Sequence, residues 1–233
     1  MSKVLVIIPA YNEEGSIVNT ISKLTKTCKN VDYVIINDCS KDSTYDICVK
    51  NNYNVINLPV NLGIGGAVQT GYKYAYRNGY DIAIQMDADG QHDPKYIKDL
   101  VKKIENGNDL AIGSRFIEKK GFQSTFIRRI GINLYSFIIK AFTGVLITDT
   151  TSGFRAAGKR IIKIFAREYP VDYPEPETNA LIAKRKYKIV EVPMKMMERD
   201  SGKSSITPVK SIYYAIKVGL AVLLACLKKN KEV

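Results

Sequence analysis

Two aspartates separated by one residue follow an apolar segment near the middle of the chain. The run Ile82–Met86 leads into the sequence DADGQH, whose acids are Asp87 and Asp89. Two carboxylates followed by a glycine can converge on one hard divalent cation such as Mg²⁺ or Mn²⁺. Such an ion would neutralise the charge that develops on a diphosphate leaving group. The alternative is a polar turn that caps the next helix, and the two acids alone leave both interpretations open.

Other apolar runs in the first half also end in polar or glycine-rich segments. The first run ends in a segment with Pro9, Tyr11 and Glu13, the second ends at Asp38, and the third leads to the glycine-rich segment 61–67. In a parallel α/β sheet, ligands bind at the carboxyl ends of the strands. We therefore expect these groups to gather with the two aspartates around one site.

The elements that must position these residues alternate between strands and helices. The β-branched run Lys3–Pro9 is typical of a strand buried on both faces of a parallel sheet. Similar runs recur at Tyr33–Ile36, Asn54–Leu58, Ile82–Met86 and Leu110–Ile112. Helical spacing of apolar residues lies between them at Ile17–Leu24, Val68–Ala75 and Ile97–Ile104, the last after the N-cap pair Asp93-Pro94. This alternation predicts an α/β fold with a parallel sheet flanked by helices.

The glycine-rich segment could suggest a dinucleotide fingerprint. Its glycines are Gly63, Gly65 and Gly66, so the third glycine of GxGxxG would fall at Val68. No acidic residue is suitably placed at the next strand end. Dinucleotide binding is therefore not expected.

The second half of the chain breaks the alternation. Segments 126–145 and 208–228 are apolar but contain basic residues, among them Arg129 and Lys217, which predicts amphipathic helices. The apolar stretch Val218–Leu227 is about half of the roughly 20 residues that cross a bilayer. We therefore expect one domain over residues 1–207 and an amphipathic C-terminal helix with a basic tail over 208–233, without a spanning segment.

Composition sets limits on the class of protein. The chain has 233 residues, of which 45% are hydrophobic and 25% charged, as in folded globular proteins. Its 35 basic and 23 acidic residues give 35 − 23 = +12, which favours anionic partners such as nucleic acid, phosphate esters or anionic lipid. No zinc-finger, helix-turn-helix or RNA-binding motif supports nucleic acid, which remains a remote alternative. Four cysteines without a CxxC pair, and no signal peptide, indicate the reducing cytoplasm.

Taken in order, these motifs resemble glycosyltransferase family 2 over nearly the whole chain. The likeness is greatest to the branch of dolichol-phosphate mannose synthases and polyprenyl-phosphate glycosyltransferases. It implies a GT-A-like, Rossmann-type, mostly parallel sheet and a divalent cation, Mg²⁺ or Mn²⁺, held by Asp87 and Asp89. It also implies that Gln91 lies beside the metal and the diphosphate. The residues implied to hold the base and ribose of a nucleotide sugar are Pro9, Tyr11, Glu13 and Asp38.

A second set of family positions concerns the acceptor. Arg115, Arg129 and Arg199 match arginines that hold the phosphate of a lipid acceptor and the donor diphosphate, a role that suits the planar guanidinium. The alternative for each is solvated surface charge. Glu177 matches an acidic family position and would act as general base towards a hydroxyl acceptor. Towards a phosphate acceptor, which needs no base, it would orient the donor sugar or be a surface acid at a helix start.

The sequence also departs from the family pattern. Asn37 stands where relatives often have a second Asp, Ile64 where many have Lys, and Asn133 where close relatives can have Ser. In the family, the glycine-rich segment is a flexible stretch leading into a helix that faces the donor. The segment Thr151–Arg155 resembles a motif near the acceptor pocket, and a structural turn is the alternative.

The resemblance implies an inverting glycosyltransferase. We expect it to move a glucose- or mannose-type hexose from a UDP- or GDP-sugar to a polyprenyl or dolichyl phosphate, with Asp89, Arg115, Arg129, Arg199 and Glu177 as catalytic residues. We expect peripheral attachment to the cytosolic membrane face, where a small membrane protein would serve as an anchor partner. The alternative is that the apolar stretches Ile138–Val145 and Val218–Leu227 pack on the core or on a partner subunit. The alternative within the family is transfer to a polysaccharide or glycolipid hydroxyl.

Overall fold

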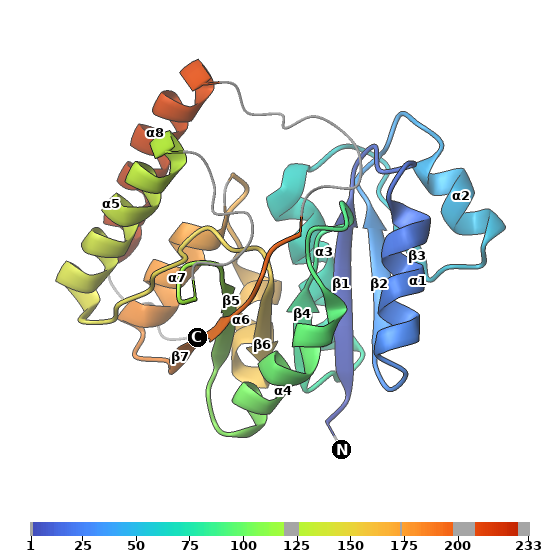
Figure 1. The fold of residues 1–233 in the computed structure, drawn as a ribbon, viewed down its shortest axis with the longest axis horizontal. Coiled ribbons are helices and arrows are strands. Elements are labelled where there is room, and N and C mark those ends of the chain that lie inside the picture. The colour runs from blue at the N-terminus through green and yellow to red at the C-terminus, as the bar shows by residue number, and fades with distance from the viewer. Residues whose placement is uncertain (1, 119–125, 173, 198–207, 228–233) are drawn as a thin grey trace.

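The computed structural model describes residues 2–118, 126–172, 174–197 and 208–227. A seven-stranded sheet with the order β3-β2-β1-β4-β6-β5-β7 lies between two layers of helices (Figure 1). The strands are β1 (Val4–Ala10), β2 (Asp32–Asn37), β3 (Val55–Asn57), β4 (Ile82–Gln85), β5 (Leu110–Ser114), β6 (Arg155–Gly158) and β7 (Ile189–Pro193). The helices are α1 (Ile17–Thr27), α2 (Thr44–Lys50), α3 (Gly63–Arg77), α4 (Ile97–Glu105), α5 (Phe126–Thr143), α6 (Lys159–Arg167), α7 (Pro174–Lys184) and α8 (Pro208–Leu227), with a 3₁₀ turn, η1 (Pro94–Tyr96), before α4.

The first four strands form the parallel half of the sheet, as predicted. Every residue of β1 is buried, and β1 pairs in parallel with β2 on one side and β4 on the other. The register places Ala10 opposite Asn37, and Ile7 opposite Gln85. The loops that follow β1, β2 and β4 therefore leave the sheet at the same edge.

The other half contains two strands, β6 and β7, that were not predicted from the sequence. β6 runs antiparallel between β4 and β5, and β7 lies parallel to β5. β6 has only four residues, RAAG, and contains no β-branched side chain, so it lacks the usual sequence signal of a strand. Its reversed direction brings the residues that precede Arg155 to the edge where β4 and β5 end.

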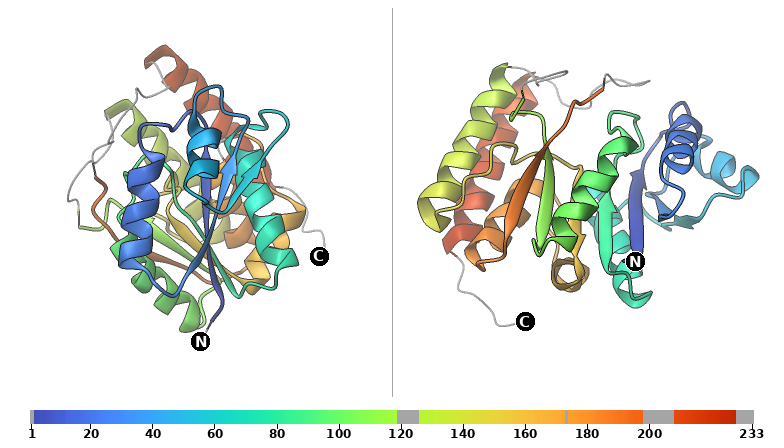
Figure 2. Two further views of the ribbon diagram at one scale, coloured as in Figure 1. Left: turned by 90° about the vertical axis from the view of Figure 1, so that its right-hand side faces the viewer. Right: turned by 60° about the horizontal axis from the view of Figure 1, so that its bottom comes forward.

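Each face of the sheet is covered by its own helices and core. One core joins the sheet to α3, α6 and α7 and includes buried residues of α5 and α8, such as Ile139 and Val222. The other core joins the opposite face to α1 and α4. α5 and α8 lie side by side at the β7 end of the sheet (Figures 1 and 2). Among the described residues, no helix combines the length and apolar character needed to cross a bilayer.

The glycine-rich segment leads into helix α3. Its residues from Gly63 onward form the first turn of α3. The backbone N–H of Gly65 donates a hydrogen bond to the carbonyl oxygen of Val171 (3.2 Å). A Cβ atom at Gly65 would lie 2.1 Å from the carbonyl oxygen of Pro170, so only glycine permits this close approach.

Candidate active site

A buried histidine organises the loop that carries the two aspartates. The backbone N–H of Asp87 donates to Nδ1 of His92 (3.0 Å), and the imidazole stacks on Phe154 with ring centres 4.9 Å apart. Burial lowers the pKa of His92 from 6.5 to about 4, although the nearby Asp89 carboxylate acts to raise it. The imidazole is therefore neutral near pH 7. Because Nδ1 accepts a hydrogen bond, the proton resides on Nε2, which lies 3.8 Å from Oδ2 of Asp87.

The carboxylate of Asp87 faces the segment that enters β6. A Cβ atom at Gly153 would lie 3.3 Å from each carboxylate oxygen of Asp87, so the missing side chain leaves the space beside that carboxylate open. Asp89 is only 4% exposed, and its Oδ1 accepts a hydrogen bond from the backbone N–H of Gln91 (3.1 Å). The sequence pointed to Asp87, Asp89 and the segment that contains Gly153, but it did not predict that Gly153 lies against the Asp87 carboxylate.

The two aspartates fit a divalent cation. No cluster of three or more acidic, histidine or cysteine side chains that could hold a metal ion occurs within the described ranges. Magnesium is commonly held by one or two carboxylates, with substrate phosphates and water as its other ligands. Asp87 and Asp89 match that pattern of two hard oxygen ligands.

The loops after β1 and β2 are tied to each other. Asn12 and Cys39 both adopt a left-handed backbone conformation with φ of 56°. The backbone N–H of Asn12 donates to Oγ of Ser40 (3.0 Å), and that of Lys41 donates to Oδ1 of Asn12 (2.8 Å). These bonds join the two loops directly after Tyr11, whose side chain is exposed.

Asp38 holds the segment that leads into α3. Its side chain is buried, and Oδ1 accepts a hydrogen bond from the backbone N–H of Leu62 (2.7 Å). Nδ2 of Asn61 donates to the carbonyl oxygen of Asp38 (3.0 Å). At the neighbouring position, Nδ2 of Asn37 donates to Oδ1 of Asn57 (2.6 Å), a bond that an ionised aspartate at position 37 could not donate.

Glu13 completes the group predicted for the nucleotide. Its Oε2 accepts a hydrogen bond from Oγ of Ser16 (2.6 Å), and its backbone N–H donates to Oγ1 of Thr44 (2.8 Å). Pro9 lies within β1, opposite Ile36. The structure thus brings Pro9, Tyr11, Glu13 and Asp38 to the adjoining ends of β1 and β2, while their roles in binding stay predictions.

Arg115 lies at the end of β5 and is bound to an acid. Nε donates to Oδ2 of Asp149 and Nη2 donates to Oδ1, both at 2.7 Å. Nη2 also donates to Oγ1 of Thr151 (2.9 Å), and Nη1 lies 3.7 Å from the sulfur of Met196. The sequence predicted Arg115 as a phosphate ligand but did not identify Asp149 as its partner.

Arg129, on α5, lies close to Arg115. Its guanidinium carbon lies 3.5 Å from the ring centre of Phe116, and that of Arg115 lies 5.1 Å from the same ring. Nη1 of Arg129 is buried and has no hydrogen-bond partner among the residues that the structure describes. The two predicted arginines are therefore brought together around Phe116. Asn133 lies one turn further along α5 and is exposed.

Arg199 falls outside the described residues, but the chain leading to it ends beside Gln91. The backbone N–H of Met197 donates to the carbonyl oxygen of Gln91 (3.0 Å), and Nε2 of Gln91 donates to the carbonyl oxygen of Met197 (3.4 Å). These bonds fix the position from which the chain continues towards Arg199.

The acidic start of α7 faces the end of β4. Glu175 and Glu177 are both half-buried, and Oε1 of Glu175 accepts a hydrogen bond from Nε2 of Gln85 (3.3 Å). The family resemblance pointed to Glu177 and not to Glu175. Only the fold shows that Glu175 touches the strand that leads to Asp87.

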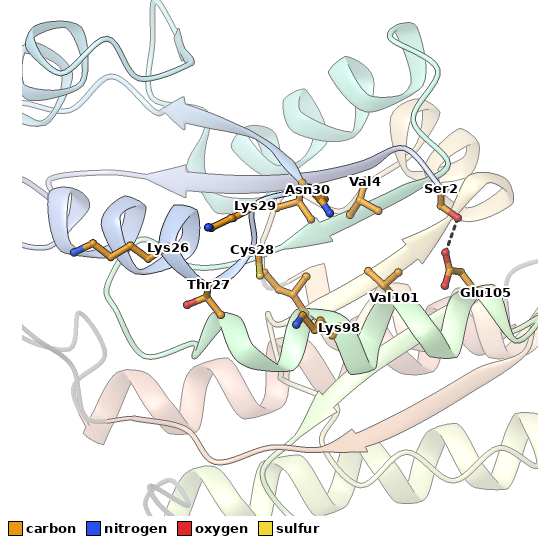
Figure 3. A pocket seen from close by; sticks show the side chains of 12 residues that line it. Ser2, Val4, Lys26, Thr27, Cys28, Lys29, Asn30, Lys98, Val101 and Glu105 are labelled. Atoms are coloured by element: carbon orange, nitrogen blue, oxygen red, sulfur yellow. Dashed lines mark hydrogen bonds between the residues drawn. The ribbon is translucent and has the colours of Figure 1, made fainter.

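A separate cavity of about 490 Å³ lies at the opposite end of the sheet (Figure 3). It is lined by residues of α4, the end of α1 and the start of β1, and Oγ of Ser2 donates to Oε1 of Glu105 (2.8 Å) at its margin. None of the predicted site residues lines this cavity. The cavity is therefore distinct from the site at the carboxyl ends of the strands.

The chain is similar in sequence to known proteins. The chain is 37% identical over 214 residues to the UDP-N-acetylglucosamine–dolichyl-phosphate N-acetylglucosaminyltransferase of Methanococcus voltae, covering 82% of this chain and 84% of the relative. It is 28% identical over 223 residues to the polyprenol monophosphomannose synthase of Mycolicibacterium smegmatis, covering 88% and 81%.

Solved structures share the fold. The glucosyl-3-phosphoglycerate synthase of Mycobacterium tuberculosis, crystallised with Mn²⁺, uridine-diphosphate-glucose and phosphoglyceric acid, matches with a TM-score of 0.73 at 18% identity, covering 98% of this chain and 81% of that chain. The family model described as Glycosyl transferase family 2 matches residues 5–165. The chain therefore belongs to glycosyltransferase family 2.

Proposed function

We propose that this glycosyltransferase transfers a glucose- or mannose-type hexose, with inversion, from a UDP- or GDP-sugar to a polyprenyl or dolichyl phosphate. The observation that carries the proposal is the convergence at one sheet edge of the Asp87–Asp89 loop, the tied loops after β1 and β2, and Arg115. The names of the relatives from Methanococcus voltae and Mycolicibacterium smegmatis support a polyprenyl-type acceptor.

The reaction joins an acceptor phosphate oxygen to the anomeric carbon of the sugar while the bond from that carbon to the donor diphosphate breaks. A phosphate acceptor is already ionised near pH 7, so the step requires no general base. Arg115, Arg129 and Arg199 hold the phosphates of the two reactants in line, which removes much of the entropic barrier. Glu177 orients the donor sugar. Pro9, Tyr11, Glu13 and Asp38 hold the nucleotide, and Gln91 lies beside the diphosphate.

Asp87 and Asp89 would hold the divalent cation, Mg²⁺ or Mn²⁺. Such a cation supplies positive charge that stabilises the departing diphosphate. The buried, neutral His92 accepts the backbone N–H of Asp87, and the missing side chain at Gly153 leaves the space beside the Asp87 carboxylate open.

Because the proposed acceptor carries a lipid chain that resides in a membrane, the enzyme has to contact a membrane surface. The paired helices α5 and α8 expose large apolar side chains, with Phe137 69% and Leu224 65% exposed. We propose that this paired surface, defined by Leu134, Phe137, Leu220 and Leu224, inserts into the cytosolic face of the membrane while basic side chains meet anionic headgroups. A small membrane protein would serve as an additional anchor. Residues 1–207 would then form the catalytic unit and 208–233 its membrane-facing extension.

A donor and acceptor screen tests the proposal. The full chain is incubated with Mn²⁺ and labelled UDP-glucose, UDP-N-acetylglucosamine or GDP-mannose, and with undecaprenyl phosphate, dolichyl phosphate or a glycolipid with free hydroxyls. We expect label in a lipid-phosphate product that mild acid releases. Transfer to the hydroxyl acceptor alone would instead establish the alternative reaction, with Glu177 as the base to be tested next.

A further inference from the structure

Arg155 is a fully buried charged residue at the end of the segment Thr151–Arg155, and the reaction proposed above assigns it no role. It opens β6, between Gln85 of β4 and Ile112 of β5, with 0% of its surface exposed. Its Nη1 donates to Oγ1 of Thr178 (2.7 Å). Its Nε and Nη2 are buried without a hydrogen-bond partner among the described residues.

Such an arginine is not explained by stability. A buried charge with unsatisfied donors carries a desolvation cost, and replacement of buried ionic groups by well-packed apolar ones is often neutral or stabilising. Natural proteins commonly tolerate local violations of this kind at functional sites. The contacts of Arg155 therefore point to a role other than stability.

Through Thr178, Arg155 reaches the first turn of α7. The hydroxyl of Thr178 accepts from Arg155 and is itself within donor distance of the carbonyl oxygens of Pro174 (2.7 Å) and Glu175 (3.0 Å). The same turn contains Glu175 and Glu177. The guanidinium thus anchors the backbone on which both acids stand.

That turn is joined to the strand that leads into Asp87. Nε2 of Gln85 donates to Oε1 of Glu175 (3.3 Å), and Oε1 of Gln85 accepts from the hydroxyl of Tyr169 (3.4 Å). Burial raises the pKa of Tyr169 well above its ordinary value, and the charges of Arg155, Glu175 and Asp87 all act on that hydroxyl. The cluster of Gln85, Arg155, Tyr169, Glu175 and Thr178 therefore lies next to Asp87 within the fold.

We propose that Arg155 is a positioning residue that holds the first turn of α7 against β4, so that Glu175 and Glu177 meet the donor sugar beside Asp87. The proposal rests on the transferase function proposed above. It gives Arg155 no contact with substrate, because the side chain is fully buried.

Arg155→Met is the primary variant, because methionine is flexible and apolar and removes only the guanidinium and its bonds. We expect kcat for glycosyl transfer to fall by about 10- to 100-fold, the effect of a small misplacement of groups around a reacting centre. We expect the dissociation constant of the nucleotide sugar, measured calorimetrically with Mn²⁺, to change by less than about threefold. The unfolding temperature should remain equal to that of the wild type or rise, which a purely structural role would not produce.

Matched variants isolate the anchoring bond. Thr178→Val removes the hydroxyl with little change in shape and should lower kcat in the same way. Thr178→Ser retains the hydroxyl and should keep kcat near the wild-type value. Arg160→Met makes the same chemical change at an exposed arginine of α6, which pairs with Asp109 (3.3 Å), and should leave kcat unchanged.

Three outcomes would overturn the inference. Wild-type kcat in Arg155→Met would show that the guanidinium positions nothing. A lower unfolding temperature, with activity reduced only in proportion to the unfolded fraction, would assign Arg155 a structural role. Absence of transfer by the wild-type protein in the donor and acceptor screen would remove the proposed function, and this inference with it. An active wild type with an equally active variant would remove the inference alone.

Discussion

Arg115 and Asp149 form a two-pronged ion pair, with Nε–Oδ2 and Nη2–Oδ1 distances of 2.7 Å each. The Asp149 side chain is fully buried, and its Oδ2 also accepts the backbone N–H of Arg115 (3.0 Å). This geometry fixes the plane and direction of the guanidinium before any phosphate arrives. Asp149 is therefore the residue that orients Arg115 at the candidate site.

Asp149→Asn should destabilise the protein strongly. The substitution keeps the size of the side chain but removes the charge that compensates the nearly buried guanidinium, and breaking a buried pair costs about 3–5 kcal/mol. Urea unfolding followed by circular dichroism measures the loss. Asp172→Asn, which removes an exposed pair with Lys217 (2.6 Å), is the control and should cost no more than about 1 kcal/mol. Equal losses in the two variants would contradict the assigned role of Asp149.

Asp87→Asn and Asp89→Asn should abolish transfer without unfolding the protein. Each variant keeps an oxygen that can accept the local hydrogen bonds but removes the charge needed to hold a divalent cation. We expect kcat to fall by at least about 100-fold, because the leaving diphosphate loses its counter-charge, and we expect Mn²⁺ to cease to strengthen nucleotide binding in calorimetry. Asp93→Asn, at the cap of η1, serves as the acidic control. Turnover retained with Mn²⁺ or Mg²⁺ would remove the metal assignment.

The buried His92 should make stability fall on acidification. Its folded-state pKa of about 4 lies below the ordinary 6.5, so the unfolded chain binds a proton more readily than the folded one. The stabilisation is complete above about pH 6.5 and is lost as the pH falls towards 4, by up to about 3 kcal/mol. Unfolding free energies of the wild type and His92→Phe, measured across this range, should differ in slope. Parallel curves would show that another group causes the pH dependence.

The parallel half of the fold could be predicted because its strands are buried on both faces. Continuous apolar runs at β1 and β4 leave a clear signal, and the shared direction of parallel strands places Asp38 and Asp87 at one edge. β6 could not be found in this way, because its residues are small or charged and its direction depends on the tertiary return of the chain.

The contacts that organise the site required the three-dimensional structure. Asp149 lies 34 residues after Arg115, and Glu175 lies 90 residues after Gln85, so neither pair has a local sequence pattern. The antiparallel β6 begins at the ends of β4 and β5, which places the preceding segment with Asp149 there, and α6 then returns the chain from the other end of β6 to Glu175. Sequence reasoning selected the residue types with suitable chemistry but missed the partners that orient them.

Membrane attachment through the paired surface of α5 and α8 should depend on its apolar side chains. Burying a phenylalanine or leucine contributes about 1.5–3 kcal/mol, so the double variant Phe137→Asp/Leu224→Asp should lower binding to anionic liposomes by more than about tenfold. Flotation at low salt measures the bound fraction, and added salt should weaken wild-type binding because headgroup attraction is screened. Val49→Asp, on the exposed side of α2 at the other end of the sheet, is the control and should still float. If the wild type does not float, or if Val49→Asp loses binding to the same extent, the paired surface is not the membrane-binding face.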